Sequence, residues 1–318
     1  MLLAVPRLEA TIRIGIVGVD SSHAPKMARI FNDANDPEHV PGARIACFFK
    51  GGSADLEMSR SRIDRFATEM RDKFGIPSVP TIAEVIENSD AIMLLSVDGR
   101  VHLDQAREVI RAGKPLFIDK PLGGSLQDAL AIVQLARQAH TPVFSSSSLR
   151  FAPEIQNARA PQLGPIRGAI SFGPAPIEPT VPDLYFYGIH PVEALYAIMG
   201  SGCESVSRSY TEDTDVVTGV WKDGRNGVLC GLRNGKTSYG LIVFGRNLIQ
   251  YETPSPPYAA LARKILSFFQ TKIPPVSLDE TLEIMAFMEA ADESKRRGGA
   301  RVALSDVMRI AGGQPGPK

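Results

Sequence analysis

Residues 12–23 read Ile12-Arg-Ile-Gly-Ile-Val-Gly-Val-Asp-Ser-Ser-His23, an aliphatic run that leads directly into a turn. Such a run is typical of a parallel strand covered on both faces. A helical pattern follows over residues 24–31, and further aliphatic runs occur at 44–49, 91–95, 116–118 and 142–145, separated by helical patterns. This alternation predicts βαβ units in a doubly wound parallel sheet with the strand order 3-2-1-4-5-6.

After Ser148 the pattern changes, because strands now follow one another. They are expected at 166–172, 205–211, 216–222, 227–233 and 239–244, with Asp223-Gly224 and Asn234-Gly235 as hairpin turns between the later ones. Helices are expected near 191–199 and 278–296. The sequence therefore predicts an α/β protein with a Rossmann-type domain over residues 1–146. An α+β domain built on an open antiparallel sheet is expected over 147–318.

Composition limits the classes of partner. The chain has 318 residues, and its 35 basic and 35 acidic side chains cancel, so no charge footprint for nucleic acid or an anionic membrane is present. Cys47, Cys203 and Cys230 form no CxxC pair, which argues against a zinc knuckle or a disulfide framework and suits a reducing compartment. The apolar start is broken by Pro6 and Arg7, too early for a signal peptide or membrane span. A cytoplasmic location is expected.

The turn after the first strand retains only part of a dinucleotide-binding fingerprint. Glycines are expected at positions 18, 20 and 23, but only Gly18 is present. The helix start can still hold an anion through the segment Gly18, Val19, Asp20, Ser21, Ser22 and His23. However, Asp20 is expected to place a carboxylate where a pyrophosphate should approach. The alternative is that Asp20 or Ser21 simply caps the helix.

The second strand ends in Lys50, where an acidic residue for a ribose diol is expected. A lysine tolerates a 2′-phosphate, so NADP is not disfavoured relative to NAD. The alternative is a solvated basic loop. Either cofactor is expected to bind weakly.

Polar side chains also follow the strand at 91–95, namely Ser96, Asp98 and His102. Ligands of doubly wound sheets bind at the carboxyl ends of the strands, so these residues are expected beside Asp20 and His23. Two aspartates and two histidines are a conceivable metal site. Helix capping and histidine–carboxylate hydrogen bonds explain the same residues more simply, and no metal is predicted.

Residues 114–121, KPLFIDKP, place Asp119 and Lys120 at the tip of an apolar strand, where both are expected to contact the cofactor. In a crevice, the Lys120 ammonium can orient a sugar hydroxyl and relay protons. The alternative is an exposed, solvated lysine.

Four motifs occur in order: GIVG at 15–18, AGKPLFIDKPL at 112–122, LRFAP at 149–153 and YGIHPVEALYAIMG at 187–200. From Ile12 to about Leu304 the chain resembles the Gfo/Idh/MocA oxidoreductase family, which includes glucose–fructose oxidoreductase and inositol dehydrogenase. The resemblance makes Lys120 the catalytic lysine of the family's E-K-P motif, with Asp119 in place of glutamate, and His190 the catalytic histidine. Arg150 and Tyr187 are expected beside a sugar-like substrate. A homodimer or homotetramer is expected through the open sheet.

The chain departs from the family at Phe186, where the family has an aspartate four residues before the histidine. Asp183 or Glu193 would have to replace it as the partner of His190. Two functions remain open. The first is an NAD(P)-dependent oxidoreductase that transfers hydride to or from a sugar or cyclitol-like polyol. The second is a family member with lost or altered redox activity, either a sugar-binding or regulatory protein or a non-redox enzyme. For His190 itself, the alternative is a buried histidine at a helix start.

Overall fold

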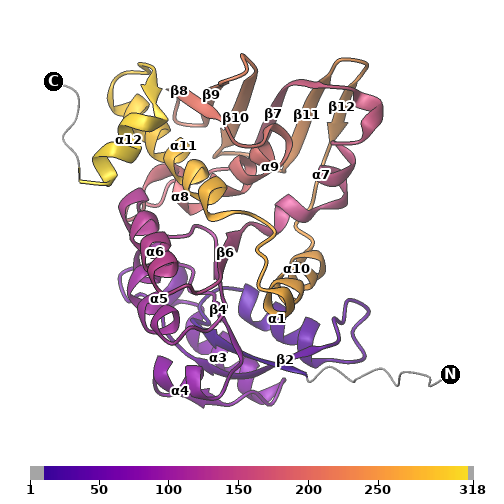
Figure 1. The fold of residues 1–318 in the computed structure, drawn as a ribbon, viewed down its shortest axis with the longest axis vertical. Helices are drawn as coiled ribbons and strands as arrows, with labels where there is room; N and C mark the ends of the chain where they lie inside the picture. The colour runs from indigo at the N-terminus through magenta and orange to yellow at the C-terminus, as the bar shows by residue number, and fades with distance from the viewer. Residues whose placement is uncertain (1–10, 314–318) are drawn as a thin grey trace.

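A computed structural model describes residues 11–313, and its first half is built on a six-stranded parallel sheet (Figure 1). The strand order is β3-β2-β1-β4-β5-β6, which confirms the predicted doubly wound sheet. The strands are β1 (Ile12–Val17), β2 (Ala43–Phe49), β3 (Ser78–Val79), β4 (Ala91–Leu94), β5 (Leu116–Asp119) and β6 (Val143–Ser146). Only the two-residue β3 was not expected from the sequence.

Helices cover both faces of this sheet, as the aliphatic strands require. Val17 of β1 packs into one hydrophobic core with α4, α5 and α6, while Ile14 and Ile16 pack into another with α1, α3 and α10. Figure 1 shows α5 and α6 on one flank and α1 and α10 on the other. The helices of this half are α1 (His23–Asn32), α2 (Glu57–Arg60), α3 (Ile63–Asp72), α4 (Ile82–Glu87), α5 (His102–Arg111) and α6 (Leu126–Gln138).

Local signals in the sequence fix several helix ends. The Ser125 hydroxyl accepts a hydrogen bond from the Asp128 amide at 3.0 Å, and the Thr81 hydroxyl accepts one from the Glu84 amide at 3.2 Å. A cap of this kind stabilises a helix by about 1 kcal/mol. Gly113 follows α5 with a φ of 68°, a conformation that favours glycine at a helix end.

A seven-stranded sheet forms the second half, in the order β12-β11-β7-β10-β9-β8-β13. Its strands are β7 (Ile166–Pro174), β8 (Cys203–Tyr210), β9 (Thr214–Trp221), β10 (Asn226–Leu232), β11 (Gly240–Gly245), β12 (Ile249–Glu252) and β13 (Val302–Ala303). Every neighbouring pair is antiparallel except β7 and β10, so the sheet is mixed and mostly antiparallel.

The position of β7 corrects one prediction. Asp223-Gly224 does join a hairpin, because β9 and β10 pair directly and Gly224 has a φ of 82°. Asn234-Gly235 does not, because β7 lies between β10 and β11 and pairs with both. Asn234-Gly235 does lie between two strands, β10 and β11, that follow each other in sequence. However, β7, from much earlier in the chain, lies between these two strands in the sheet.

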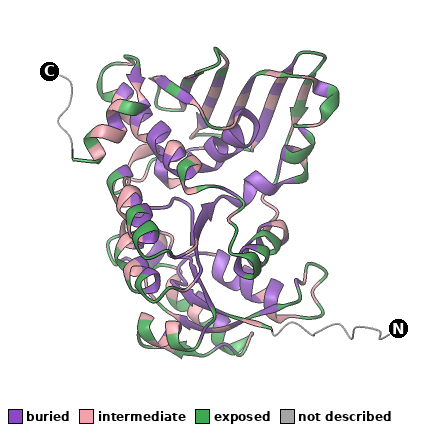
Figure 2. Ribbon diagram, viewed as in Figure 1, coloured by how far each residue is buried: buried purple, intermediate pink, exposed green. Residues whose placement is uncertain are grey.

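One face of the second sheet is covered and the other is open. α9 and α11 pack on the covered face, where Trp221, Tyr196 and Phe287 are buried. Along the strands, buried positions alternate with partly exposed ones (Figure 2). The open face is strongly apolar, and its side chains include Ile170, Phe172, Val216, Val228, Leu232, Ile242, Phe244 and Ile249.

The helices of the second half are α7 (Pro153–Asn157), α8 (Asp183–Phe186), α9 (Ile189–Met199), α10 (Tyr258–Thr271), α11 (Leu278–Arg296) and α12 (Leu304–Ala311). Short 3₁₀ turns occur at Gly99–Val101, Ser148–Phe151 and Pro161–Leu163. α10 was not predicted, and it returns to the first half to pack against α1 and over Phe117 and Phe144.

Across residues 11–313, none of the helices has the length and apolar character needed to cross a membrane. The apolar start at residues 1–5 and its interruption at Pro6 lie outside the described residues. The division of the chain at residues 146 and 147 stays a prediction.

Candidate functional site

A cavity of about 110 Å³ opens where the carboxyl edge of the first sheet meets the second half. Lys120, at the end of β5, and His190, in the first turn of α9, both line it although they are far apart in the sequence. The remaining lining residues are Ser21, Ser22, His23, Met58, Arg62, Val97, Phe186, Tyr187, Tyr239, Pro256 and Tyr258. The lining contains four titratable nitrogen side chains and no carboxylate.

Lys120 is 8% exposed, and its ammonium lies 5.9 Å from the centre of the Tyr187 ring. The preceding Asp119 is buried beneath the cavity. Burial raises the pKa of Asp119, but the nearby His23 and Lys120 charges outweigh it and lower that pKa to about 2. Asp119 therefore remains a carboxylate at neutral pH.

His23 occupies the position of the third fingerprint glycine and begins α1. Its Nδ1 lies 2.6 Å from Asp119 Oδ2, and its ring meets the Tyr258 ring edge-on at a centroid distance of 5.0 Å. Both His23 and Asp119 were predicted as cofactor-binding residues, but their pairing was not. It depends on the ends of β1 and β5 lying close together, on either side of β4.

His190 binds a hydroxyl rather than a carboxylate. Its Nδ1 lies 2.7 Å from Ser147 Oγ, which also accepts a hydrogen bond from the Leu149 amide at 3.2 Å. Burial, reinforced by the charge of Lys120, lowers the pKa of His190 well below its ordinary value, so the ring is neutral at pH 7. Ser147 was missed from the sequence, where only a run of four serines marks it.

Neither carboxylate expected to serve His190 touches it. Glu193 accepts a hydrogen bond from Arg150 Nε at 2.7 Å and one from the Ser147 amide at 3.2 Å. Asp183 pairs with Arg208 at 2.9 Å and with Lys295 at 2.6 Å. The expectation that one of them replaces the missing aspartate is wrong, because both are engaged in other ion pairs.

Two residues were expected beside the substrate through the resemblance. Tyr187 lines the cavity. Arg150 is buried outside the lining, where its guanidinium pairs with Glu193 and Glu280 and so ties the start of the second half to α9 and α11.

The side chains of Asp20, His23, Asp98 and His102 do not converge, contrary to the prediction that they share one crevice. Asp20 is fully buried and accepts hydrogen bonds from Ser59 Oγ at 2.6 Å and the Val97 amide at 3.0 Å. Asp20 does not line the cavity, so its carboxylate does not oppose an anion there. This removes one reason for expecting weak cofactor binding.

Asp98 accepts hydrogen bonds from the Arg100 amide and guanidinium, and Arg100 also pairs with Asp55. His102 has both ring nitrogens bound, Nδ1 to Pro121 O and Nε2 to Ser96 O, each at 2.9 Å. Within residues 11–313, no group of three or more histidine, cysteine or acidic side chains is arranged to hold a metal ion.

The segments around Gly18 pack too tightly for a larger residue there. Gly18 has a φ of 86°, and a Cβ on it would lie 2.1 Å from Ser96 Oγ. The Ser96 hydroxyl itself donates to Gln105.

Lys50 is half exposed, and its ammonium lies 2.5 Å from Asp64 Oδ1. This pairing agrees with the alternative of a solvated loop.

The residues at the start of α1 fit the pyrophosphate of a dinucleotide. In the part of the chain that the structure describes, the Ser21 and Ser22 amides donate no hydrogen bond. They lie at a helix N-terminus, which favours anions, and Arg62 lines the same cavity. Small-molecule pockets usually measure about 300–1,000 Å³, so a cavity of about 110 Å³ can enclose only part of a dinucleotide.

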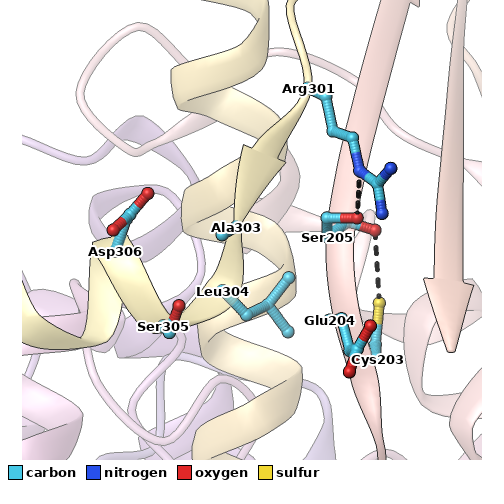
Figure 3. A pocket seen from close by; sticks show the side chains of 8 residues that line it. All are labelled: Cys203, Glu204, Ser205, Arg301, Ala303, Leu304, Ser305 and Asp306. Carbon is cyan, nitrogen blue, oxygen red and sulfur yellow. Dashed lines mark hydrogen bonds between the residues drawn. The ribbon is translucent and has the colours of Figure 1, made fainter. Parts of the chain in front are cut away.

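A roomier cavity of about 670 Å³ lies at the edge of the second sheet, between β8 and α12 (Figure 3). Arg301 points to Ser205, whose hydroxyl accepts its Nε–H at 2.6 Å, while Asp306 lies apart from both on α12. Burial raises the pKa of the Cys203 thiol to about 12, so it is not a reactive thiolate. This cavity lacks the converging polar groups of a catalytic site.

Comparisons with known proteins support the resemblance. Residues 12–147 match the family model described as an oxidoreductase family with an NAD-binding Rossmann fold, Gfo/Idh/MocA. Inositol 2-dehydrogenase 3 of Saccharopolyspora erythraea is 27% identical over 128 residues. That match covers 39% of this chain and only 32% of the curated relative. The resemblance drawn from the four motifs is thus confirmed over the first half of the chain.

Solved structures show the same fold over nearly the whole chain. The myo-inositol 2-dehydrogenase of Lactobacillus plantarum is 14% identical with a TM-score of 0.75, covering 92% of this chain and 99% of that one. An oxidoreductase of Agrobacterium radiobacter, solved with NAD⁺, L-tartaric acid and magnesium, is 16% identical with a TM-score of 0.74. It covers 94% of this chain and 100% of that one. At these identities the likeness establishes the fold and leaves the substrate open.

Proposed function

We propose that this chain, whose residues 12–147 match the Gfo/Idh/MocA oxidoreductase family, transfers hydride between NAD(P) and a carbinol carbon of a sugar or cyclitol-like polyol. The observation that carries the proposal is the meeting of Lys120 and His190 in one cavity beside the start of α1. One side chain comes from each half of the molecule, as a site between a cofactor domain and a substrate domain requires.

The chain's own residues supply binding and proton handling. The Ser21 and Ser22 amides and Arg62 hold the negatively charged pyrophosphate at the helix start. When bound, NAD(P)⁺ supplies the hydride acceptor. The Lys120 ammonium donates a hydrogen bond to the reacting hydroxyl and stabilises negative charge on its oxygen. One of the two imidazoles that line the cavity, His23 or His190, accepts the hydroxyl proton.

The walls suit a ligand rich in hydroxyl groups. Tyr187, Tyr239 and Tyr258 line the cavity, and each carries an aromatic ring and a phenolic hydroxyl. Aromatic faces pack against the C–H groups of a ring, and the phenols donate and accept hydrogen bonds. This combination supports a polyol or cyclitol rather than a wholly apolar substrate.

The first test is cofactor binding followed by turnover. Titration of the purified protein with NADH and, separately, NADPH should change the nicotinamide fluorescence. Polyol-dependent reduction of NAD⁺ or NADP⁺ should then appear with a panel of cyclitols and hexoses. Because Lys50 is paired with Asp64, we expect little preference between the two cofactors. If neither nucleotide binds, the function with lost or altered redox activity is favoured instead.

We also propose a homodimer or homotetramer built on the open face of the second sheet. Val216 and Ile249 on this face are 39% and 66% exposed, and a cavity of about 350 Å³ lined by Ile170, Val228 and Phe244 hollows it. An exposed apolar surface of this kind is stabilised when a second copy covers it.

A further inference from the structure

The third fingerprint position carries a histidine that is paired with a carboxylate, a combination typical of acid–base groups in enzymes. His23 Nδ1 lies 2.6 Å from Asp119 Oδ2. Asp119 is buried, and one of its carboxylate oxygens contacts this imidazole. The low pKa of Asp119 keeps the carboxylate charged. The only ring nitrogen of His23 with a close partner among residues 11–313 is Nδ1, beside Asp119, so Nε2 is the nitrogen left for a ligand in the cavity that His23 lines.

His190 lacks such a partner. Phe186 stands where a carboxylate was expected, and Ser147 binds Nδ1 instead. A neutral hydroxyl stabilises an imidazolium far less than a carboxylate does. Of the two imidazoles in the cavity, only His23 is in direct contact with a carboxylate.

We propose that His23, held by Asp119, is the catalytic acid–base group of this site, and that Asp119 acts as its positioning residue. This inference rests on the proposed redox function. In the oxidation direction, His23 Nε2 takes the proton of the substrate hydroxyl. The hydride leaves the same carbon with its electron pair and reduces NAD(P)⁺ to NAD(P)H, while the alcohol becomes a ketone. The proton on His23 then passes to solvent.

Lys120 and His190 retain separate tasks. Lys120, directly after Asp119, lies where its ammonium can hold the substrate oxygen next to His23. His190, fixed by Ser147, is a neutral hydrogen-bonding group in the opposite wall. The charged and titratable groups that surround His23 are Asp119 and Lys120 at the end of β5, Tyr258 of α10, Lys26 of α1 above the Tyr258 ring, Arg62 before α3, Tyr187 after α8, His190 of α9 and Tyr239 before β11.

The kinetic test compares His23→Asn with His190→Asn, using whichever polyol of the panel wild type oxidises fastest. We expect His23→Asn to lower kcat by about 10²–10⁴-fold. We expect His190→Asn to act mainly on KM. His140→Asn is the matched control, since His140 is an exposed histidine outside the cavity with a φ of 51° that asparagine tolerates. Full kcat in His23→Asn, with the loss confined to His190→Asn, would overturn the proposal.

The role of Asp119 is tested with Asp119→Asn, which keeps the shape and removes the charge. We expect the acid limb of the kcat/KM profile to move to lower pH, because the carboxylate beside His23 is lost. A merely structural role would lower activity without moving this limb. Asp119→Glu, which keeps the charge, should restore the wild-type limb.

A second measurement does not require turnover. The chain has five histidines, so ¹⁵N-histidine NMR can resolve the ring nitrogens of each one. We expect the ring-nitrogen shifts of His23 at pH 7 to change in Asp119→Asn, because Nδ1 loses its charged partner, while the signals of the half-buried His39 and the exposed His140 stay unchanged. His23 shifts identical to those of wild type would refute the pairing. If wild type oxidises no polyol, the proposed function and the catalytic role both fail, and the NMR result alone shows whether the pair exists.

Discussion

His190 Nδ1 and Ser147 Oγ lie 2.7 Å apart, a hydrogen bond that joins α9 to the segment directly after β6. The same hydroxyl caps the 3₁₀ turn at Ser148–Phe151 through the Leu149 amide. One serine therefore fixes both the imidazole and the backbone where the chain leaves the first sheet.

The first prediction concerns this serine. Ser147→Ala should raise KM several-fold and change kcat less, because His190 keeps its place in α9 but loses the bond that orients its ring, worth about 1 kcal/mol. Ser147→Thr should recover most of the affinity, since it keeps the hydroxyl. Steady-state kinetics of both variants provide the check, and a Thr variant as impaired as the Ala variant would contradict it.

The second prediction concerns Lys120. Lys120→Met should lower turnover by about 10²–10⁴-fold, while the circular dichroism spectrum and the NAD(P)H fluorescence titration stay close to wild type. Methionine keeps an unbranched side chain of similar length but loses the ammonium that lies over the Tyr187 ring. Turnover that survives this replacement would place the chemistry elsewhere in the cavity.

The third prediction uses Phe186. Phe186→Asp introduces a carboxylate four residues before His190, so it should restore part of the activity lost in His23→Asn by giving His190 a charged partner. Phe186→Asn is the control, because it has a similar shape without the charge. Rates of the two double variants should therefore differ, and equal rates would argue against a relay through His190.

The fourth prediction concerns pH and stability. The pKa of Asp119 is about 2 in the folded protein against 3.8 ordinarily, so its contribution to stability is present above about pH 4. That contribution is lost as the pH falls toward 2, and its size is about 2 kcal/mol. Urea unfolding at pH 7 and at pH 3 should show a smaller pH dependence in Asp119→Asn than in wild type. An identical pH dependence would contradict the prediction.

The fifth prediction concerns assembly. Ile249→Asp on the open sheet face should shift the protein toward monomer in light scattering after size-exclusion chromatography. Ile273→Asp should leave the assembly unchanged, because Ile273, although 72% exposed, lies after α10 and away from that face. Equal effects of the two substitutions would locate the interface elsewhere.

The parts of the fold that could be predicted from sequence are those with local causes. The aliphatic runs of β1 and β4 predict buried parallel strands, and Ser125 and Thr81 mark helix starts through bonds to amides three residues on. The insertion of β7 between β10 and β11 depends on pairing between distant segments, which turn residues such as Asn234 do not encode.

The candidate site shows the same division. Lys120 and His190 could be proposed from motifs, and the structure places both in one cavity, although their roles stay predictions. The partners of these residues could not be proposed. His23 meets Asp119 because of strand order, and Ser147 meets His190 because α9 packs on the turn after β6.

The return of α10 to the first sheet means that the chain passes between the two halves three times: after β6, before α10 and before α11. Two halves joined by three chain crossings resist rotation relative to each other more than two halves joined by one. The residues that line the cavity therefore fall into two groups, one on each half of the molecule. His23, Lys120 and Tyr258 move with the first sheet, while Tyr187, His190 and Tyr239 move with the second. If the halves separate to admit a ligand, the His23–Asp119 pair stays assembled and the wall that contains His190 moves away.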